Sequence, residues 1–169
     1  EDDNFLASDI PRGVVCLGGG DSKEHVSDCF VLTLNRKRVT ISELPSLPAP
    51  LANGTGVLHE GIIYLLGGLH SPEHEQAAKV FWKLDLTVTR ENRQWLKLEP
   101  WPGAPRMLAV AGVINNTICL FSGTDLYKNE NGILSRRYLS DGFSYNLKEK
   151  QWKKTAPLPR PAVAAPTPA

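Results

Sequence analysis

Long apolar runs, surplus charge and metal-binding patterns are all missing from this sequence of 169 residues. Its 19 Lys and Arg residues nearly balance its 18 Asp and Glu residues, so it lacks the basic surplus that marks proteins bound to nucleic acid or to anionic membranes. No apolar run approaches the roughly 20 residues that cross a bilayer. We therefore expect neither a nucleic acid nor a membrane as a partner.

Cysteine is scarce, and its spacing excludes the common metal motifs. The three cysteines, Cys16, Cys29 and Cys119, form no Cys-X-X-Cys pair. Cys16 and Cys119 lie in two copies of one repeated apolar run, which places them in separate sheets, so we expect buried free thiols rather than a disulfide. His70 and His74 are four residues apart, but a proline separates them and no third ligand is suitably spaced. The sequence therefore predicts no metal site.

The sequence does contain an apolar run, closed by two small residues, that occurs three times. Its copies are residues 13–19, 62–68 and 117–123, with the closing pairs 49 and then 55 residues apart. Each run has the length and the β-branched content of a buried strand. The prolines Pro50, Pro105 and Pro159 lie 55 and 54 residues apart, in step with the runs. Two markers with a shared period of about 50 residues predict a kelch-type β-propeller.

With four strands in each blade, this period predicts an all-β protein of three blades and the start of a fourth. The expected bounds are about 1–48, 49–103, 104–157 and 158–169. We expect the innermost strand of the first blade near residues 4–8, and a long loop from Thr124 to Ser140 in the third blade.

A propeller closes into a ring, typically of about four to eight blades, because closure removes open sheet edges. Three blades and a fraction form only an arc. We therefore expect either further blades or a second copy of the chain to complete the ring. The open faces of the arc predict that the isolated chain associates with itself.

Three features of the repeat resemble kelch repeats: a diglycine after an apolar strand, an aromatic residue in the third strand, and a tryptophan that begins the fourth. Tyr145 and Trp152, in the third expected blade, fit the pattern best. Trp95 is the corresponding tryptophan of the second expected blade. More narrowly, the linkers that lead into inner strands resemble those of the cyclically permuted mutarotase family, relatives of the bacterial N-acetylneuraminate epimerases. These linkers are residues 50–54, 101–106 and 158–161.

The mutarotase resemblance implies a six-bladed ring that interconverts the α and β anomers of a sugar, typically sialic acid, without a cofactor or metal. The chemistry needs a base for the anomeric hydroxyl and an acid for the ring oxygen, and a guanidinium suits the carboxylate of a sialate. The family's Glu and Arg lie in the blade after the long-loop blade. Here that blade would begin after Ala165, so we assign no catalytic residue within the chain. The resemblance alone favours a periplasmic or secreted protein.

Five residues are candidates for binding the sugar. Arg106 begins an inner strand, where it either recognises an anion or satisfies carbonyl groups of neighbouring blades, and Arg160 is expected at the corresponding place in the next blade. Asn53 either bonds a sugar hydroxyl or caps a turn. His70 and Asp125 each follow a repeated run by two residues, on loops that either bind a ligand or brace the fold.

Two functions from different classes remain open. The leading hypothesis is a fragment of a sugar isomerase that resembles the sialic acid mutarotases. The alternative is a non-catalytic kelch module whose loops bind a protein or a glycan, because propellers host both kinds of function. The basic pair Arg136-Arg137 in the long loop can meet an anionic sugar, but it is also typical of a solvent-facing pair.

Overall fold

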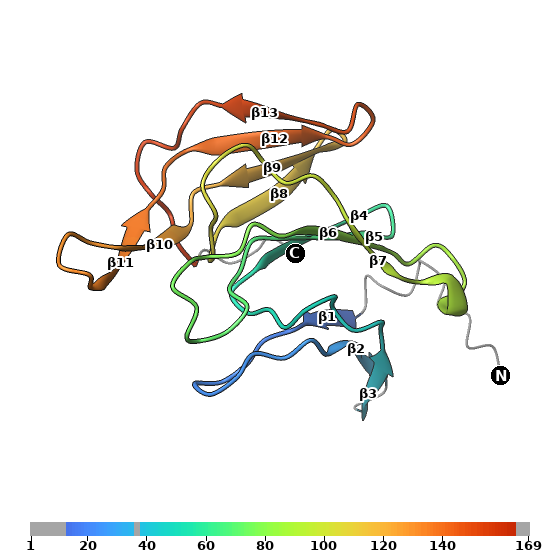
Figure 1. Ribbon diagram of the computed structural model, residues 1–169. Coiled ribbons are helices and arrows are strands. Elements are labelled where there is room, and N and C mark those ends of the chain that lie inside the picture. The colour runs from blue at the N-terminus through green and yellow to red at the C-terminus, as the bar shows by residue number, and fades with distance from the viewer. Residues whose placement is uncertain (1–12, 36–37, 165–169) are drawn as a thin grey trace.

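The computed structural model describes residues 13–35 and 38–164. Over this range the chain folds almost entirely into short antiparallel strands, gathered in small sheets that follow one another across the molecule (Figure 1). One turn of 3-10 helix, Arg90–Asn92, interrupts the second sheet. The strand expected near residues 4–8 lies outside the described residues.

Three of the sheets have the strand order expected of propeller blades, and we call them blades 1, 2 and 3. Blade 1 contains β1 (Gly13–Leu17), β2 (Cys29–Asn35) and β3 (Arg38–Glu43). Blade 2 contains β4 (Thr55–His59), β5 (Ile62–Leu66), β6 (Phe81–Asp85) and β7 (Trp95–Lys97). Blade 3 contains β8 (Val110–Ile114), β9 (Thr117–Phe121), β12 (Gly142–Asn146) and β13 (Gln151–Thr155).

The loop predicted in blade 3 is instead a β-hairpin, and the expectation of a plain loop was wrong. β10 (Thr124–Lys128) and β11 (Leu134–Tyr138) pair antiparallel, with Leu126 opposite Arg136. The hairpin projects sideways from the blade (Figure 1, orange). Asn131-Gly132 lies at its tip, and this dipeptide is a common hairpin turn signal that the interpretation of the sequence passed over.

The apolar run at β5 is continuous because this strand is buried on both faces. In β5, Ile63 and Leu65 pack toward blade 1, whereas Tyr64 and Leu66 pack toward blade 3. This division follows from the strand geometry, in which successive side chains point to opposite faces of a sheet. Blade 2 is therefore held to blades 1 and 3 by two separate apolar cores.

The closing pair of each run joins one blade to the next through the backbone. In each copy the N–H of the second residue donates to a carbonyl of the following blade. The bonds join Gly19 to Leu51, Gly68 to Arg106 and Gly123 to Ala162, at 2.9, 2.9 and 3.2 Å. All six residues of the three pairs have left-handed φ angles, between 58° and 119°. Glycine adopts such angles without strain, which explains the repeated diglycine.

The third copy places Ser122 where the others have glycine, at a φ of 58°. Its hydroxyl donates to the Leu139 carbonyl at 2.6 Å and accepts the N–H of Ala162 at 2.7 Å. The left-handed region is costly for residues other than glycine. The two hydrogen bonds, one to the buried Leu139 and one across the blade junction to Ala162, offset part of that cost.

All three cysteines are free, as the sequence predicted, but only Cys29 is buried, whereas Cys16 and Cys119 are half-buried. Cys29 belongs to the core between blades 1 and 2. Burial raises the pKa of its thiol to about 11, so Cys29 stays protonated and unreactive near neutral pH.

One face of blade 1 has no sheet packed against it among the described residues. Val14, Leu32 and Ile41 lie in one cross-strand row on this face. Leu34 and Val39 form the next row, and the exposed fractions of Val39 and Ile41 are 63% and 67%. We call these five residues the open face of blade 1. Apolar patches of this kind usually mark an interaction surface.

The open face leads to a prediction about association. The isolated chain should associate as its concentration rises, and Ile41→Glu should shift light scattering back toward monomer, because a charge in the apolar row opposes burial. Ile133→Glu is the matched control, because Ile133 is 61% exposed on the hairpin turn and lies outside the open face. A monodisperse wild-type monomer at every concentration would contradict the prediction.

Candidate functional site

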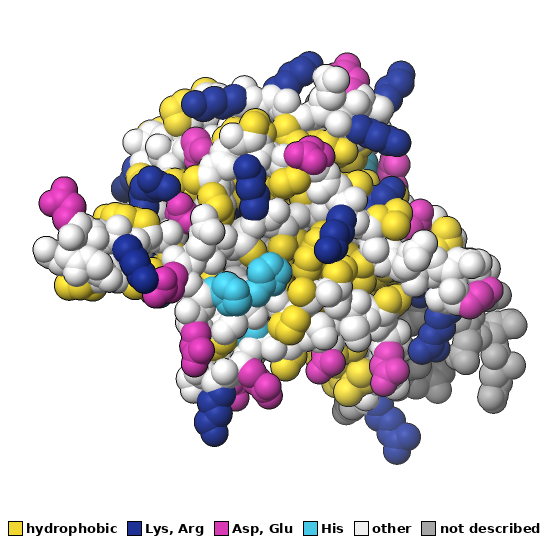
Figure 2. Space-filling model, viewed as in Figure 1, with side chains coloured by type: hydrophobic (Ala, Val, Ile, Leu, Met, Phe, Trp, Pro, Cys, Tyr) yellow, Lys and Arg dark blue, Asp and Glu magenta, His cyan; other side chains and the backbone are white. Residues whose placement is uncertain are grey.

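A cavity of about 320 Å³ lies where the β10–β11 hairpin meets the starts of blades 2 and 3. Small-molecule sites typically fall between about 300 and 1,000 Å³, so the cavity suits a monosaccharide. Histidine side chains gather near the middle of the face shown in Figure 2. The lining consists of Asn53, Leu69, Pro72, His74, Met107, Leu126, Leu134, Ser135 and Arg136. We call this space the hairpin cavity.

The floor of the hairpin cavity is apolar and fixed by backbone hydrogen bonds. Leu69, Met107 and Leu126 are only 6%, 4% and 9% exposed, and they form a small cluster separate from the two blade cores. Met107 and Thr124 exchange N–H···O=C bonds of 2.9 Å in both directions. Leu69 is held by a similar pair of bonds to Ala52, at 2.8 and 2.9 Å.

The polar lining residues come from separate segments of the chain. Asn53 lies in the bend before β4 with a φ of 58°, and its carbonyl accepts the Leu108 N–H at 2.8 Å. This bond fixes the backbone and leaves the amide side chain exposed. His74 comes from the loop after β5, and Ser135 and Arg136 come from β11. The lining thus offers an amide, an imidazole and a guanidinium, whereas the Ser135 hydroxyl already donates to the Ile133 carbonyl at 3.3 Å.

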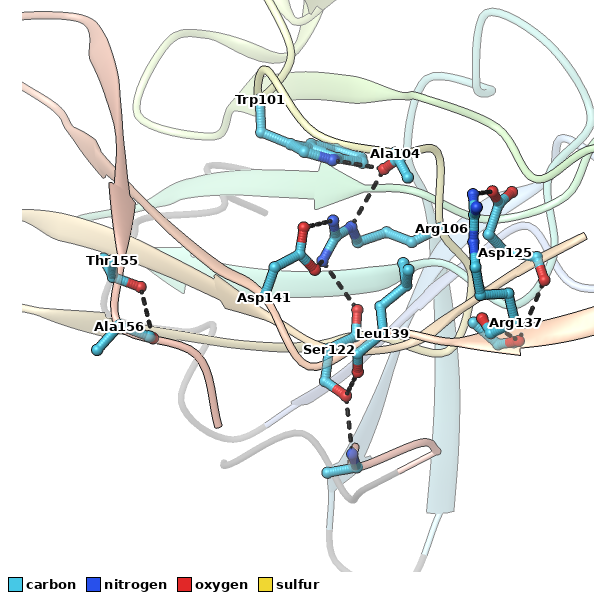
Figure 3. Close-up of polar contacts among 12 residues, drawn as sticks. Trp101, Ala104, Arg106, Ser122, Asp125, Arg137, Leu139, Asp141, Thr155 and Ala156 are labelled. Atoms are coloured by element: carbon cyan, nitrogen blue, oxygen red, sulfur yellow. Dashed lines mark hydrogen bonds and ion pairs between the residues drawn. The ribbon is translucent and has the colours of Figure 1, made fainter. Parts of the chain in front are cut away.

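Two ion pairs brace the hairpin beside the cavity. Asp125 is 4% exposed, and its Oδ2 lies 2.7 Å from Nη2 of Arg137 (Figure 3). Its Oδ1 accepts the N–H of Leu126 at 2.9 Å. Lys128 Nζ lies 2.6 Å from Glu75 Oε2, which ties the hairpin to the loop after β5. Asp125 was expected on a loop, whereas the structure places it within β10 in this bracing position.

Arg106 lies at the junction of blades 2 and 3, away from the lining of the hairpin cavity. Its side chain is 0% exposed, and Nη1 donates to the Ser122 carbonyl at 3.0 Å. Nη2 donates to Oδ2 of Asp141 at 3.0 Å (Figure 3). The guanidinium carbon lies 5.4 Å from the ring centre of Trp101 and 5.2 Å from that of Phe143. Of the two roles considered for Arg106, these contacts favour the structural one.

Arg160 does not correspond to Arg106, contrary to the expectation from the sequence. The Gly68–Arg106 bond is repeated by the Gly123–Ala162 bond, so Ala162 holds the equivalent position. The proline that marks this blade junction is therefore Pro161, and counting from Pro159 shifted the alignment by two residues. Arg160 itself is exposed and lies outside the cavity lining.

His70 also lies outside the lining, although its neighbour His74 belongs to it. Its Nδ1 bonds the Pro50 carbonyl at 2.8 Å, and its ring centre lies 6.0 Å from that of His74 and 6.4 Å from that of Trp82. Asn53 is thus the one predicted binding residue that the structure brings to the cavity. His74, Met107 and Leu126 were not predicted to bind, since only the folded chain brings them together, and Arg136 was considered only as half of a basic pair that meets either an anionic sugar or the solvent.

Within residues 13–35 and 38–164, no group of three or more His, Cys, Asp and Glu side chains is arranged to hold a metal ion. No helix in the same range is long and apolar enough to cross a membrane.

No protein-family model matches the chain. N-acetylneuraminate epimerase 2 of Escherichia coli O6:H1 is 32% identical over 113 residues, which are 67% of this chain and 27% of that protein. N-acetylneuraminate epimerase of Salmonella arizonae is 30% identical over 112 residues, or 66% of this chain and 26% of that protein. The chain is a homologue of the N-acetylneuraminate epimerases. It spans about a quarter of the length of these curated relatives.

A solved structure supports the same relationship. The structure of YjhT matches this epimerase homologue with a TM-score of 0.52 and 26% identity, covering 71% of this chain and 32% of that one. Together with the antiparallel four-stranded sheets, this match confirms the predicted all-β propeller class. The predicted family relationship is confirmed as well.

The hairpin cavity of the epimerase homologue is equipped for binding rather than for carboxylate acid–base chemistry. Among the described residues, its lining contains neither Asp nor Glu. The amide and imidazole groups suit sugar hydroxyls, and the guanidinium suits an anion. A carboxylate that transfers protons must therefore come from outside the lining.

Proposed function

We propose that the chain forms part of a propeller that interconverts the anomers of N-acetylneuraminate or a closely related sugar. The observation that carries this proposal is the identity of about 30% with proteins named for an N-acetylneuraminate epimerase activity, over about two thirds of the chain. The hairpin cavity adds a site of suitable volume and polarity on the described blades.

The proposed chemistry needs no cofactor. A base removes the proton of the anomeric hydroxyl while an acid protonates the ring oxygen, the ring opens, and closure on the other face gives the second anomer. In this chain we assign binding to the hairpin cavity. We assign proton transfer to the Glu and Arg that the family resemblance places in the blade after Ala165.

The test is one-dimensional proton NMR of freshly released α-N-acetylneuraminate at a pH where spontaneous exchange is slow. We expect the complete ring that carries these blades to speed the conversion of the α signals into β signals. The 169-residue chain alone should bind the sugar without speeding the exchange, because its cavity lining lacks a carboxylate. Heat-denatured protein is the control.

A well-folded complete ring that leaves the exchange at its spontaneous rate would overturn the proposal. If that ring still bound the sugar, the result would support the non-catalytic binding module instead. Acceleration by the 169-residue chain alone would move the proton-transfer groups into the described blades, and His74 would then be the first residue to replace.

A further inference from the structure

We infer that the hairpin cavity is an acid-recognising subsite in which Arg136 binds the carboxylate of the sugar and the floor of Leu69, Met107 and Leu126 takes an apolar substituent. The choice of sugar rests on the proposed function. The roles of the residues are argued from the contacts of this chain.

The strand register separates the two neighbouring arginines. Arg136 lies opposite Leu126 and Arg137 lies opposite Asp125, and directly opposed residues of an antiparallel pair share a face. Arg137 is therefore on the face of Asp125, where its guanidinium carbon also lies 5.9 Å from the ring centre of Tyr127. Arg136 is on the face of Leu126, which lines the cavity.

Arg136 carries a positive charge that the surrounding structure does not neutralise. No acidic side chain of the described residues is hydrogen-bonded or ion-paired to Arg136, and the lining contains no carboxylate. The nearby Glu75 is already paired with Lys128 at 2.6 Å. Arg136 is an exposed residue that lines the cavity. A guanidinium without an anionic partner favours an anionic ligand, and its planar fork matches a carboxylate at two points.

The floor restricts the ligand further. Leu69, Met107 and Leu126 are almost completely buried, so only a small apolar group, such as the methyl of an N-acetyl substituent, can pack against them. Asn53 and His74 lie in the same lining and suit hydroxyl groups. Carboxylate, acetyl and hydroxyl groups on one small ring describe an acidic N-acetylated sugar.

The bracing of the hairpin supports tight recognition. The Lys128–Glu75 pair joins β10 to the loop that supplies Pro72 and His74, and the Asp125–Arg137 pair joins the two strands of the hairpin. A site held in place before binding loses less entropy when the ligand arrives. The backbone at Arg136 is therefore held by its hairpin before a ligand arrives.

The test is titration calorimetry of the 169-residue chain with three sugars. N-acetylneuraminate carries both the carboxylate and the acetyl group, N-acetylmannosamine lacks the carboxylate, and 2-keto-3-deoxynononate has a hydroxyl in place of the acetylamino group. We expect both partial ligands to bind about tenfold more weakly than N-acetylneuraminate, since each loses one of the two contacts.

Variants of Arg136 test whether its guanidinium is the group that binds the carboxylate. Arg136→Gln should weaken N-acetylneuraminate binding by about tenfold or more and leave N-acetylmannosamine binding unchanged. Arg136→Lys should restore part of the affinity, because it keeps the charge without the fork. Arg90→Gln is the matched control, because Arg90 is exposed in the 3-10 turn, on the opposite side of the molecule from the hairpin (Figure 1).

The outcomes separate this inference from the proposed function. Equal losses in Arg136→Gln and Arg90→Gln, equal affinity for all three sugars, or no binding to the wild-type chain would overturn the inference. If the complete ring speeds anomer exchange and Arg136→Gln leaves its KM unchanged, the inference fails and the function stands. If Arg136→Gln weakens binding of the acid while the ring leaves exchange at its spontaneous rate, the function fails and the inference stands.

Discussion

Replacing Arg106 by methionine is expected to lower the free energy of unfolding by about 3–5 kcal/mol, because removing one partner of a buried ion pair leaves the charge of the other without compensation. The variant would leave the Asp141 carboxylate without its cation and the Ser122 carbonyl without its donor. It would also remove the cation that lies against the rings of Trp101 and Phe143. Because the Asp141 side chain keeps 29% exposure, the loss should fall toward the lower end of this range.

Urea unfolding followed by tryptophan fluorescence measures this loss. Arg160→Met is the matched control and should change the unfolding free energy by less than about 0.5 kcal/mol, because Arg160 is exposed. If the folded fraction of Arg106→Met still binds the sugar as the wild type does, Arg106 acts in stability and not in recognition. A variant as stable as the wild type would contradict the structural role.

Gly67→Ala is expected to cost about 2–4 kcal/mol, since it combines a left-handed backbone with a steric clash. The φ of Gly67 is 63°, and an added Cβ would lie 2.3 Å from the carbonyl oxygen of Arg106. That carbonyl accepts the N–H of Gly68, so relieving the clash must open the bond between blades 2 and 3.

Gly112→Ala supplies the comparison within the same fold. A Cβ at Gly112 meets no atom within 4 Å, so this change should leave the stability within about 0.5 kcal/mol of the wild type. The difference between the two unfolding midpoints in urea isolates the cost at the blade junction. Equal midpoints for the two alanine variants would show that the diglycine does not secure the junction.

The sequence predicted the blades well because their signal is local and repeated. The run at β5 is apolar at every position, as a strand buried on both faces must be, and the runs at β5 and β9 each end in residues with a left-handed backbone. Trp152 was predicted from its place in the repeat, and its indole N–H bonds the Glu99 carbonyl of the preceding linker at 2.8 Å.

The site was harder to predict because it depends on contacts between distant segments. Asn53, Met107 and Leu126 meet only after blades 2 and 3 have packed, and no local pattern marks them as neighbours. Arg106 was a candidate because it is a charged residue beside a proline at the start of an expected inner strand. In the structure its buried side chain is instead paired with Asp141. Arg136 could be separated from Arg137 only once the hairpin register was known.

The most direct test of the account locates the sugar on the chain. Two-dimensional ¹⁵N–¹H NMR of the 169-residue protein, recorded during addition of N-acetylneuraminate, reports which backbone amides the ligand perturbs. The account predicts shifts concentrated in the hairpin and in the loop after β5, around Leu126, Arg136 and His74, with blade 1 unchanged. Shifts confined to other segments, or none at saturating sugar, would contradict the assignment of the hairpin cavity as the sugar site.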